Sequence, residues 1–244
     1  MLQNESNLYP YSVSDFSSKD ALVVAPHPDD ESLGCGGSLV KHIAAGSRVK
    51  IIFLTDGEKG DFECRYGEDY RTLRRASSHK ALGILGVTDY EFWGYADRNL
   101  YPAESEVGER LIHVVEGFSP SLIYLTSPFE AHPDHRASFN AVWKIRKKIA
   151  VPILLYEILM ALYPNTLVDI SREMNQKKKA IGCYHTELIY NDYLSKVEGL
   201  NRFRTATLPR NVKYAEAFML FEEKEHVTDT LSFKLLTAAG KGSW

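Results

Sequence analysis

The sequence predicts an α/β fold in which a mostly parallel sheet carries helices on both faces. Apolar, β-branched segments alternate with amphipathic segments of helical spacing from residue 21 to residue 157, which is the order typical of βαβ units. The β-branched segments are apolar at nearly every position, as in strands buried on both faces. Glycines and turn-forming pairs separate the segments, where helices end and strands turn.

Five strands are expected in this region, and all but the short one at 89–93 are mainly apolar runs. They are ALVVA (21–25), VKIIFLT (49–55), DYEFW (89–93), SLIYLT (121–126) and ILLYE (153–157). The helices between them repeat apolar residues every three or four positions, and Gly46 and Gly86 close two of them. They are expected at 31–45, 70–85, 107–118 and 135–149. The strand order 3-2-1-4-5 would give a Rossmann-like three-layer α/β/α sandwich.

The C-terminal part is less regular. Ser171 fits the N-cap of a helix over 171–182, a second helix is expected around 191–204, and AEAFMLF (215–221) fits a strand. Residues 1–19 form a polar lead-in. Because the chain contains no repeat and no low-complexity linker, we expect a single domain over residues 20–244.

The composition argues against several classes of function. The net charge of −3 provides no basic patch for nucleic acid or anionic lipid. The longest apolar stretch, 151–163, includes a proline and a glutamate and is shorter than the ~20 residues that a transmembrane span needs. Three separated cysteines and a polar N-terminus predict reduced thiols and no secretion signal. We therefore expect a cytoplasmic protein, and the sequence leaves a homo-oligomer open.

Two polar clusters follow predicted strands. HPDDE (27–31) comes directly after the first strand, and HPDH (132–135) comes after the fourth. In open parallel sheets, ligands bind beyond the carboxyl ends of the strands, at the point where the strand order reverses. If the first and fourth strands are neighbours there, the two clusters face each other across one crevice.

These clusters have the composition of a metal site. Adjacent carboxylates repel one another unless a cation, a shifted proton or water compensates them. His27, Asp30 and His135 would supply two imidazoles and one carboxylate to a divalent metal, and would leave a fourth tetrahedral position for water. Because Asp29 and Asp30 are adjacent, their side chains diverge, so one can bind metal while the other stays beside the water. His132 would lie on the other side of that water.

The two motifs, PHPDDE (26–31) and HPDH (132–135), resemble those of the PIG-L/LmbE-like family of zinc-dependent N-acetylglucosamine deacetylases. The resemblance extends to LTDGEKGD (54–61), Arg74 ahead of LGILGV (82–87), Asp97 in GYAD, KKKAIGCYHTE (177–187) and AEAF (215–218). It implies a deacetylase that uses Zn²⁺ or another divalent metal and acts on an amino sugar or a glycoconjugate.

The resemblance also implies a role for each matching residue. The implied metal ligands are His27, Asp30 and His135. The implied catalytic residues are Asp29 as general base, a protonated His132 at the oxyanion or the leaving amine, and Asp134 as its modulator. The implied sugar contacts are Arg74 and Asp97. Asp134 has a second reading, as a cap of the helix that starts near His135. Ser77 departs from the family, which has a glutamate three residues after the arginine.

Gly34, Gly36 and Gly37 offer a different reading, because glycines followed by Asp56 recur in dinucleotide-binding folds. The geometry of that motif argues against it here. Its glycines belong in the turn after the first strand, but this turn is HPDD, whose carboxylates would repel a pyrophosphate. Position 39, where the third glycine belongs, is a leucine. A hydrolase of N-acetyl groups is therefore the prediction, and a non-catalytic metal- or nucleotide-binding module is the alternative.

Overall fold

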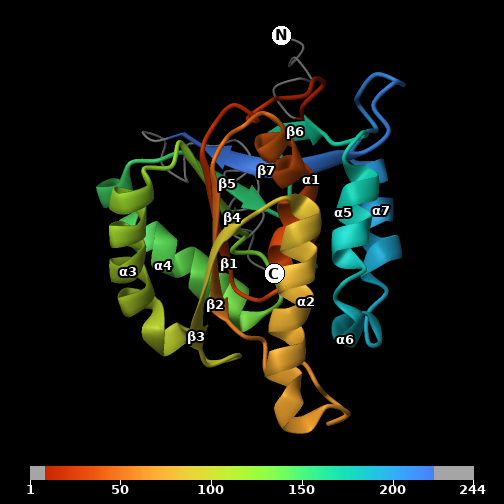
Figure 1. Cartoon of the computed structure of the whole chain (residues 1–244). Helices are drawn as coiled ribbons and strands as arrows, with labels where there is room; N and C mark the ends of the chain where they lie inside the picture. The colour runs from red at the N-terminus through yellow and green to blue at the C-terminus, as the bar shows by residue number, and fades with distance from the viewer. Residues whose placement is uncertain (1–8, 223–244) are drawn as a thin grey trace, which may run out of the picture.

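A computed structural model describes residues 9–222 (Figure 1). Within these residues, seven strands form one sheet in the order β3-β2-β1-β4-β5-β7-β6. The strands are β1 (Ala21–Ala25), β2 (Val49–Thr55), β3 (Asp89–Tyr95), β4 (Leu122–Thr126), β5 (Ile153–Tyr156), β6 (Thr166–Asp169) and β7 (Ala215–Phe221). The pairs from β3 to β5 are parallel, and β7 is antiparallel to both of its neighbours. The predicted order of the first five strands is confirmed.

Helices cover both faces of the sheet, as Figure 1 shows. One face carries α3 (Glu104–Phe118) and α4 (Pro133–Ile149). The other carries α1 (Asp30–Ala44), α2 (Tyr70–Leu85) and α5 (Met174–Ile181), with α6 (His185–Leu188) and α7 (Tyr193–Phe203) following α5. Short 3₁₀ turns at Gly67–Asp69 and Tyr101–Ala103 precede α2 and α3. This is the three-layer sandwich that the alternating pattern predicts.

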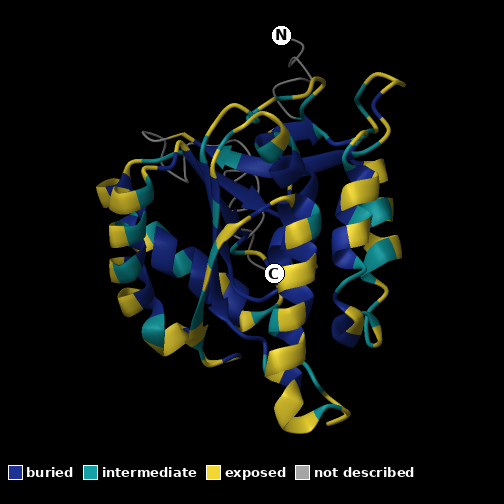
Figure 2. Ribbon diagram, viewed as in Figure 1, coloured by how far each residue is buried: buried dark blue, intermediate teal, exposed yellow. Residues whose placement is uncertain are grey.

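Both faces of β1 contribute to a hydrophobic core, because successive side chains of a strand point to opposite sides. Val23 packs in the core beneath α1, α2 and α5, whereas Leu22 and Val24 pack beneath α3 and α4. Figure 2 shows the same division: the central strands are buried, edge strand β3 is partly exposed, and the exposed residues of the helices lie on their outer faces. The central strands therefore hold the loops at their carboxyl ends on a rigid base.

The glycines of α1 serve close packing. A Cβ atom on Gly34 would lie 2.2 Å from the ring of Tyr156, and one on Gly37 would lie 2.7 Å from Ile170. Only glycine allows α1 to approach β5 and the end of β6 this closely. These glycines lie inside the helix and not in the turn that precedes it, which removes the basis of the dinucleotide reading.

The C-terminal third departs from the predictions in two places. The helix expected from Ser171 begins at Met174, because the Ser171 hydroxyl donates to Asp169 Oδ1 at 2.5 Å instead of capping a helix; that N-cap prediction is wrong. Strand β6 was not expected. Residues 1–8 of the lead-in and residues 223–244 of the predicted domain lie outside the described part. Among residues 9–222, none of the helices has the length and apolar character of a membrane span.

Candidate active site

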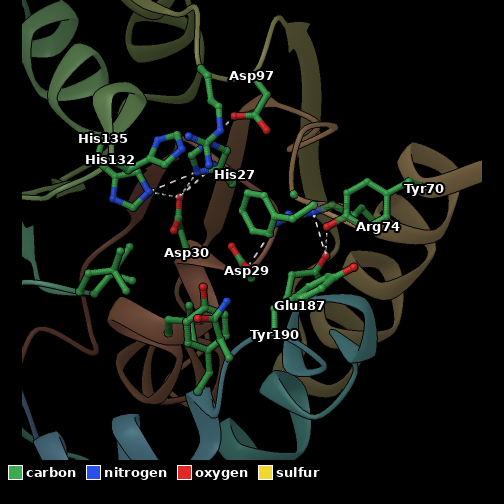
Figure 3. A pocket seen from close by; sticks show the side chains of 18 residues that line it. His27, Asp29, Asp30, Tyr70, Arg74, Asp97, His132, His135, Glu187 and Tyr190 are labelled. Carbon is green, nitrogen blue, oxygen red and sulfur yellow. Dashed lines mark hydrogen bonds and ion pairs between the residues drawn. The ribbon is translucent and has the colours of Figure 1, made fainter. Parts of the chain in front are cut away.

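The two polar clusters meet at one end of the sheet, as the sequence predicts. His27 follows β1, and His132 and His135 follow β4 and begin α4. Because β1 and β4 are parallel neighbours, their carboxyl ends lie side by side, and the side chains of the two loops face each other (Figure 3). They line one cavity together with Asp29, Asp30 and residues of α2, α6 and α7.

Three donor atoms form a nearly equilateral triangle. His27 Nδ1 lies 3.2 Å from His135 Nε2, and Asp30 Oδ2 lies 3.3 Å from each of these nitrogens. In tetrahedral zinc sites the metal–ligand bonds are about 2.0–2.2 Å, so neighbouring donor atoms are about 3.3–3.5 Å apart. The triangle has the size and the chemistry of three such ligands, so these residues fit a divalent metal.

Two buried acids fix the orientation of His27. Its Nε2 lies 3.2 Å from Asp97 Oδ1 and 3.3 Å from Asp134 Oδ2. Asp134 is itself held by the backbone N–H groups of Arg98 and Leu100, at 2.6 and 3.0 Å. A proton on Nε2, shared with these carboxylates, leaves Nδ1 free as a ligand, which is the arrangement of many metal-binding histidines. Asp97 and Asp134 therefore both contact His27, and neither caps a helix.

Two other groups of donors also come close together. Atoms of His27, His132 and His135 lie within 4.8 Å of one another, as do atoms of His27, Asp97, His132 and Asp134. The three distances of the triangle, 3.2, 3.3 and 3.3 Å, match the spacing of tetrahedral ligands. Figure 3 shows Asp30 pointing between His27 and His135, and His132 standing beside them. We therefore treat His27, Asp30 and His135 as the candidate ligands.

Carboxylates surround the two histidines of the triangle. Burial disfavours their charged forms, but Asp134, Asp30 and Asp97 together hold the pKa of His27 well above its ordinary value. Asp30 likewise overcomes burial and raises the pKa of His135 to about 9. Conversely, the histidines hold the pKa of Asp30 far below its ordinary value despite burial. A divalent cation would take the place of the protons on these rings.

His132 occupies the N-cap of α4. Its Nδ1 accepts the backbone N–H of Asp134 at 3.2 Å, so in the neutral ring the proton is on Nε2. Burial and the positive charges on His27 and His135 lower the pKa of His132 to about 4. With both of those rings charged, His132 is a neutral N–H donor. Its protonation when a metal takes the place of those charges stays a prediction.

Asp29 and Asp30 point in different directions, as their adjacent positions predict. Asp29 has φ 135° and ψ −28°, a conformation that L-residues rarely adopt and that is found mainly where a site holds it in place. Its carboxylate lies 3.3 Å from Arg74 Nη2 and lines the same cavity as the triangle (Figure 3). Burial raises the pKa of Asp29, and Arg74 opposes that rise.

The Arg74 side chain makes its polar contacts with other residues of the protein. The buried guanidinium forms ion pairs with Asp29 and Glu187, the latter at 3.3 Å from Nε, and it donates to Pro28 O at 2.5 Å. Glu187, from α6, also accepts from Tyr70 Oη at 3.0 Å. Arg74 and Asp97 both line the cavity, as the implied sugar contacts should. In the structure, however, Arg74 contacts Asp29 and Glu187, and Asp97 contacts His27. Glu187 was not expected, because a lone carboxylate in HTE has no distinctive spacing.

The sequence is similar to known deacetylases. A diacetylchitobiose deacetylase of Thermococcus kodakarensis is 28% identical over 188 residues, covering 69% of this chain and 70% of the relative. A probable N-acetyl-alpha-D-glucosaminyl L-malate deacetylase of Bacillus anthracis is 31% identical over 134 residues, or 52% of this chain. The chain spans only 58% of that second relative.

Solved structures share the fold. The N,N'-diacetylchitobiose deacetylase of Pyrococcus horikoshii superposes with a TM-score of 0.74 at 25% identity, covering 85% of this chain and 86% of the other. A 4-carboxy-2-hydroxymuconate hydratase from a Pseudomonas superposes at 0.68 and 23% identity over 87% of this chain and 99% of the other, which shows the common fold alone. The sequence model of PIG-L, described as GlcNAc-PI de-N-acetylase, matches residues 22–146, more than half of the chain. This protein therefore belongs to the PIG-L family.

Proposed function

We propose that this protein is a metal-dependent hydrolase that removes the N-acetyl group from an amino-sugar substrate, with Zn²⁺ as the metal. The observation that carries the proposal is the triangle of His27 Nδ1, Asp30 Oδ2 and His135 Nε2 with Asp29 beside it in the same buried cavity. Deacetylases among the relatives supply the substrate class.

His27, Asp30 and His135 would hold the metal, which in such sites polarises a carbonyl and acidifies water. Asp29 accepts the proton of the attacking water as the water oxygen bonds to the acetamide carbon. The carbon–nitrogen bond then breaks, and the amine nitrogen takes up the proton that Asp29 carried. The second product forms as acetic acid and becomes acetate when its remaining proton passes to the free amine or to solvent.

His132 would stabilise the negative charge that develops on the acetamide oxygen. Its Nδ1 is occupied by the N–H of Asp134, so Nε2 presents the donor. One such donor typically contributes 10²–10³-fold to kcat. Asp97 and Asp134 would keep His27 in the tautomer that binds metal, and Arg74 would keep Asp29 in place.

Acetate release tests the proposal. The metal-loaded protein is mixed with N-acetylglucosamine and its glycosides, and acetate and free amine are measured together. We expect equal amounts of both, with loss of activity on chelation and recovery on adding Zn²⁺. Because a hydratase shares this fold, loss of substrate without acetate would point to other chemistry. A protein that binds metal but releases no acetate from any amino sugar would contradict the proposal.

A further inference from the structure

A second cavity of about 350 Å³ opens next to the catalytic cavity. The two share the side chains of Leu33, Ile158, Leu159 and Tyr193, so the second cavity is a side groove of the first. The rest of its lining is Ala161 and one face of α7, where Val197 and Leu200 follow Tyr193 at helical spacing. A substrate seated at the candidate metal ligands therefore has a direct path into this groove.

The groove is almost entirely apolar. Of the eight residues that line it, Lys196 alone carries a charge, and none of these described residues is acidic. The Lys196 ammonium lies 5.9 Å from the ring of Tyr193, at the exposed edge. A second sugar ring would bring several hydroxyl groups to a wall with few polar partners, and unpaired polar groups are costly to desolvate. An alkyl or aryl group would meet no such cost.

The loop that forms one wall is held open by buried carboxylates. Glu130 accepts the backbone N–H groups of Ile158 and Leu159 at 2.8 and 3.2 Å. At the other end of the loop, Glu157 accepts the N–H of Leu162 at 2.8 Å and pairs with Arg204. These buried hydrogen bonds fix the loop that carries Leu159. Leu159 is 48% exposed at the edge of the cavity, as expected if an apolar ligand covers it.

We infer that the substrate of this site carries an apolar aglycone, neutral or anionic at its far end, and that this group occupies the groove between α1, the 157–165 loop and α7. The inference rests on the proposed function, since it takes the amino sugar to lie at the candidate metal ligands. A cationic end group is disfavoured, because the described lining offers it no acidic partner and Lys196 carries a like charge.

The test compares methyl, propyl, hexyl and 6-aminohexyl N-acetylglucosaminides below their aggregation limits. Binding is measured by calorimetry on metal-loaded Asp29→Asn protein, and kcat/KM on the wild type. Transfer of each methylene into an apolar site supports a gain of about fourfold, so the hexyl glycoside should bind at least about tenfold more tightly than the methyl glycoside. The aminohexyl glycoside should lose most of this gain.

Variants on α7 locate the effect. Leu200→Ser removes apolar wall from the groove and should reduce the hexyl-to-methyl ratio about threefold or more. Phe203→Ser is the matched control, because Phe203 lies on the same helix, is 66% exposed and lines neither cavity. Ala161→Phe adds bulk to the lining of the groove and should reduce the ratio further.

The outcomes separate the two proposals. Chain-length-dependent binding that Leu200→Ser weakens, without acetate release, would support the groove and contradict the deacetylase. Acetate release with equal affinity for all four glycosides would overturn the groove inference, and a second copy of the chain covering the groove would give this result. Equal effects of Leu200→Ser and Phe203→Ser would overturn it as well.

Discussion

Replacing Arg74 by methionine tests whether its guanidinium holds the acids at the base of the cavity. The side chain is buried and lies 3.3 Å from both Glu187 and Asp29. Two unit charges at this distance attract by about 5 kcal/mol at an effective dielectric constant of about 20. Removing one partner of a buried pair typically costs about 3–5 kcal/mol, because the other charge is left without compensation. We expect Arg74→Met to lower the free energy of unfolding by about 4 kcal/mol.

The assay is urea denaturation of the metal-free protein at pH 7, which keeps metal binding from masking the loss. Arg71→Met is the matched control: Arg71 lies on the same helix, but its side chain is 55% exposed, so its loss should cost less than about 1 kcal/mol. In the double variant Arg74→Met/Glu187→Gln, the carboxylate that Arg74 compensated is absent as well. That variant should be more stable than the sum of the single effects predicts, by at least about 1 kcal/mol.

A loss below about 1 kcal/mol for Arg74→Met, or additive effects in the double variant, would refute this reasoning. Either result would mean that Asp29 is stabilised by protonation, and Glu187 by the hydrogen bonds that Tyr70 and Thr186 donate to it. The Arg74 guanidinium would then be available to a substrate, which is the role that the sequence resemblance implies for it.

Three further predictions concern single residues. His135→Ala removes a candidate ligand and should abolish stoichiometric metal binding, whereas His132→Ala should keep the metal and lower kcat about 10²–10³-fold; equal metal loss in both would make His132 a ligand. Asp29→Asn should keep the metal by elemental analysis and lose about 10²–10⁴-fold in kcat; metal loss would mean that Asp29 coordinates. Burial lowers the pKa of His42, whose Nε2 lies 3.0 Å from Tyr124 Oη. His42 therefore binds a proton more tightly in the unfolded chain than in the folded protein, so the free energy of unfolding should fall as pH drops below about 6.5. A His42→Gln variant whose unfolding free energy has the same pH dependence as the wild type would contradict this.

The fold and the meeting of the two motifs were predictable because they follow from local pattern and general topology. A continuous apolar run such as 21–25 fits a central strand, and the helical segments between runs impose parallel connections. Parallel strands expose their carboxyl ends at one edge, so motifs that follow β1 and β4 meet once those strands are neighbours. The structure shows this pairing directly, between Ala21 and Leu122 and onward.

What the sequence did not reveal depends on contacts between distant elements. Glu187 reaches Arg74 from α6 across 113 positions of the chain, and no spacing rule connects a single acid to a single arginine at that range. The roles of Asp97 and Asp134 beside His27 also arise only from packing. Strand β6 has four residues and is specified by its pairing with β7 more than by its own composition, which is usual for short edge strands.

Three consecutive acids at the start of α1 remain compatible because each faces a different partner. Asp29 points to Arg74, and Asp30 points to the two histidines of the triangle. Glu31 accepts hydrogen bonds from Tyr184 Oη and from Ser32 Oγ, both at 2.6 Å. The unusual backbone of Asp29 is what separates the first two directions, so its strain has a chemical use. In the proposed function, Asp30 would bind the metal and Asp29 would take the proton of the attacking water, while Glu31 holds α1 against the segment that follows α5.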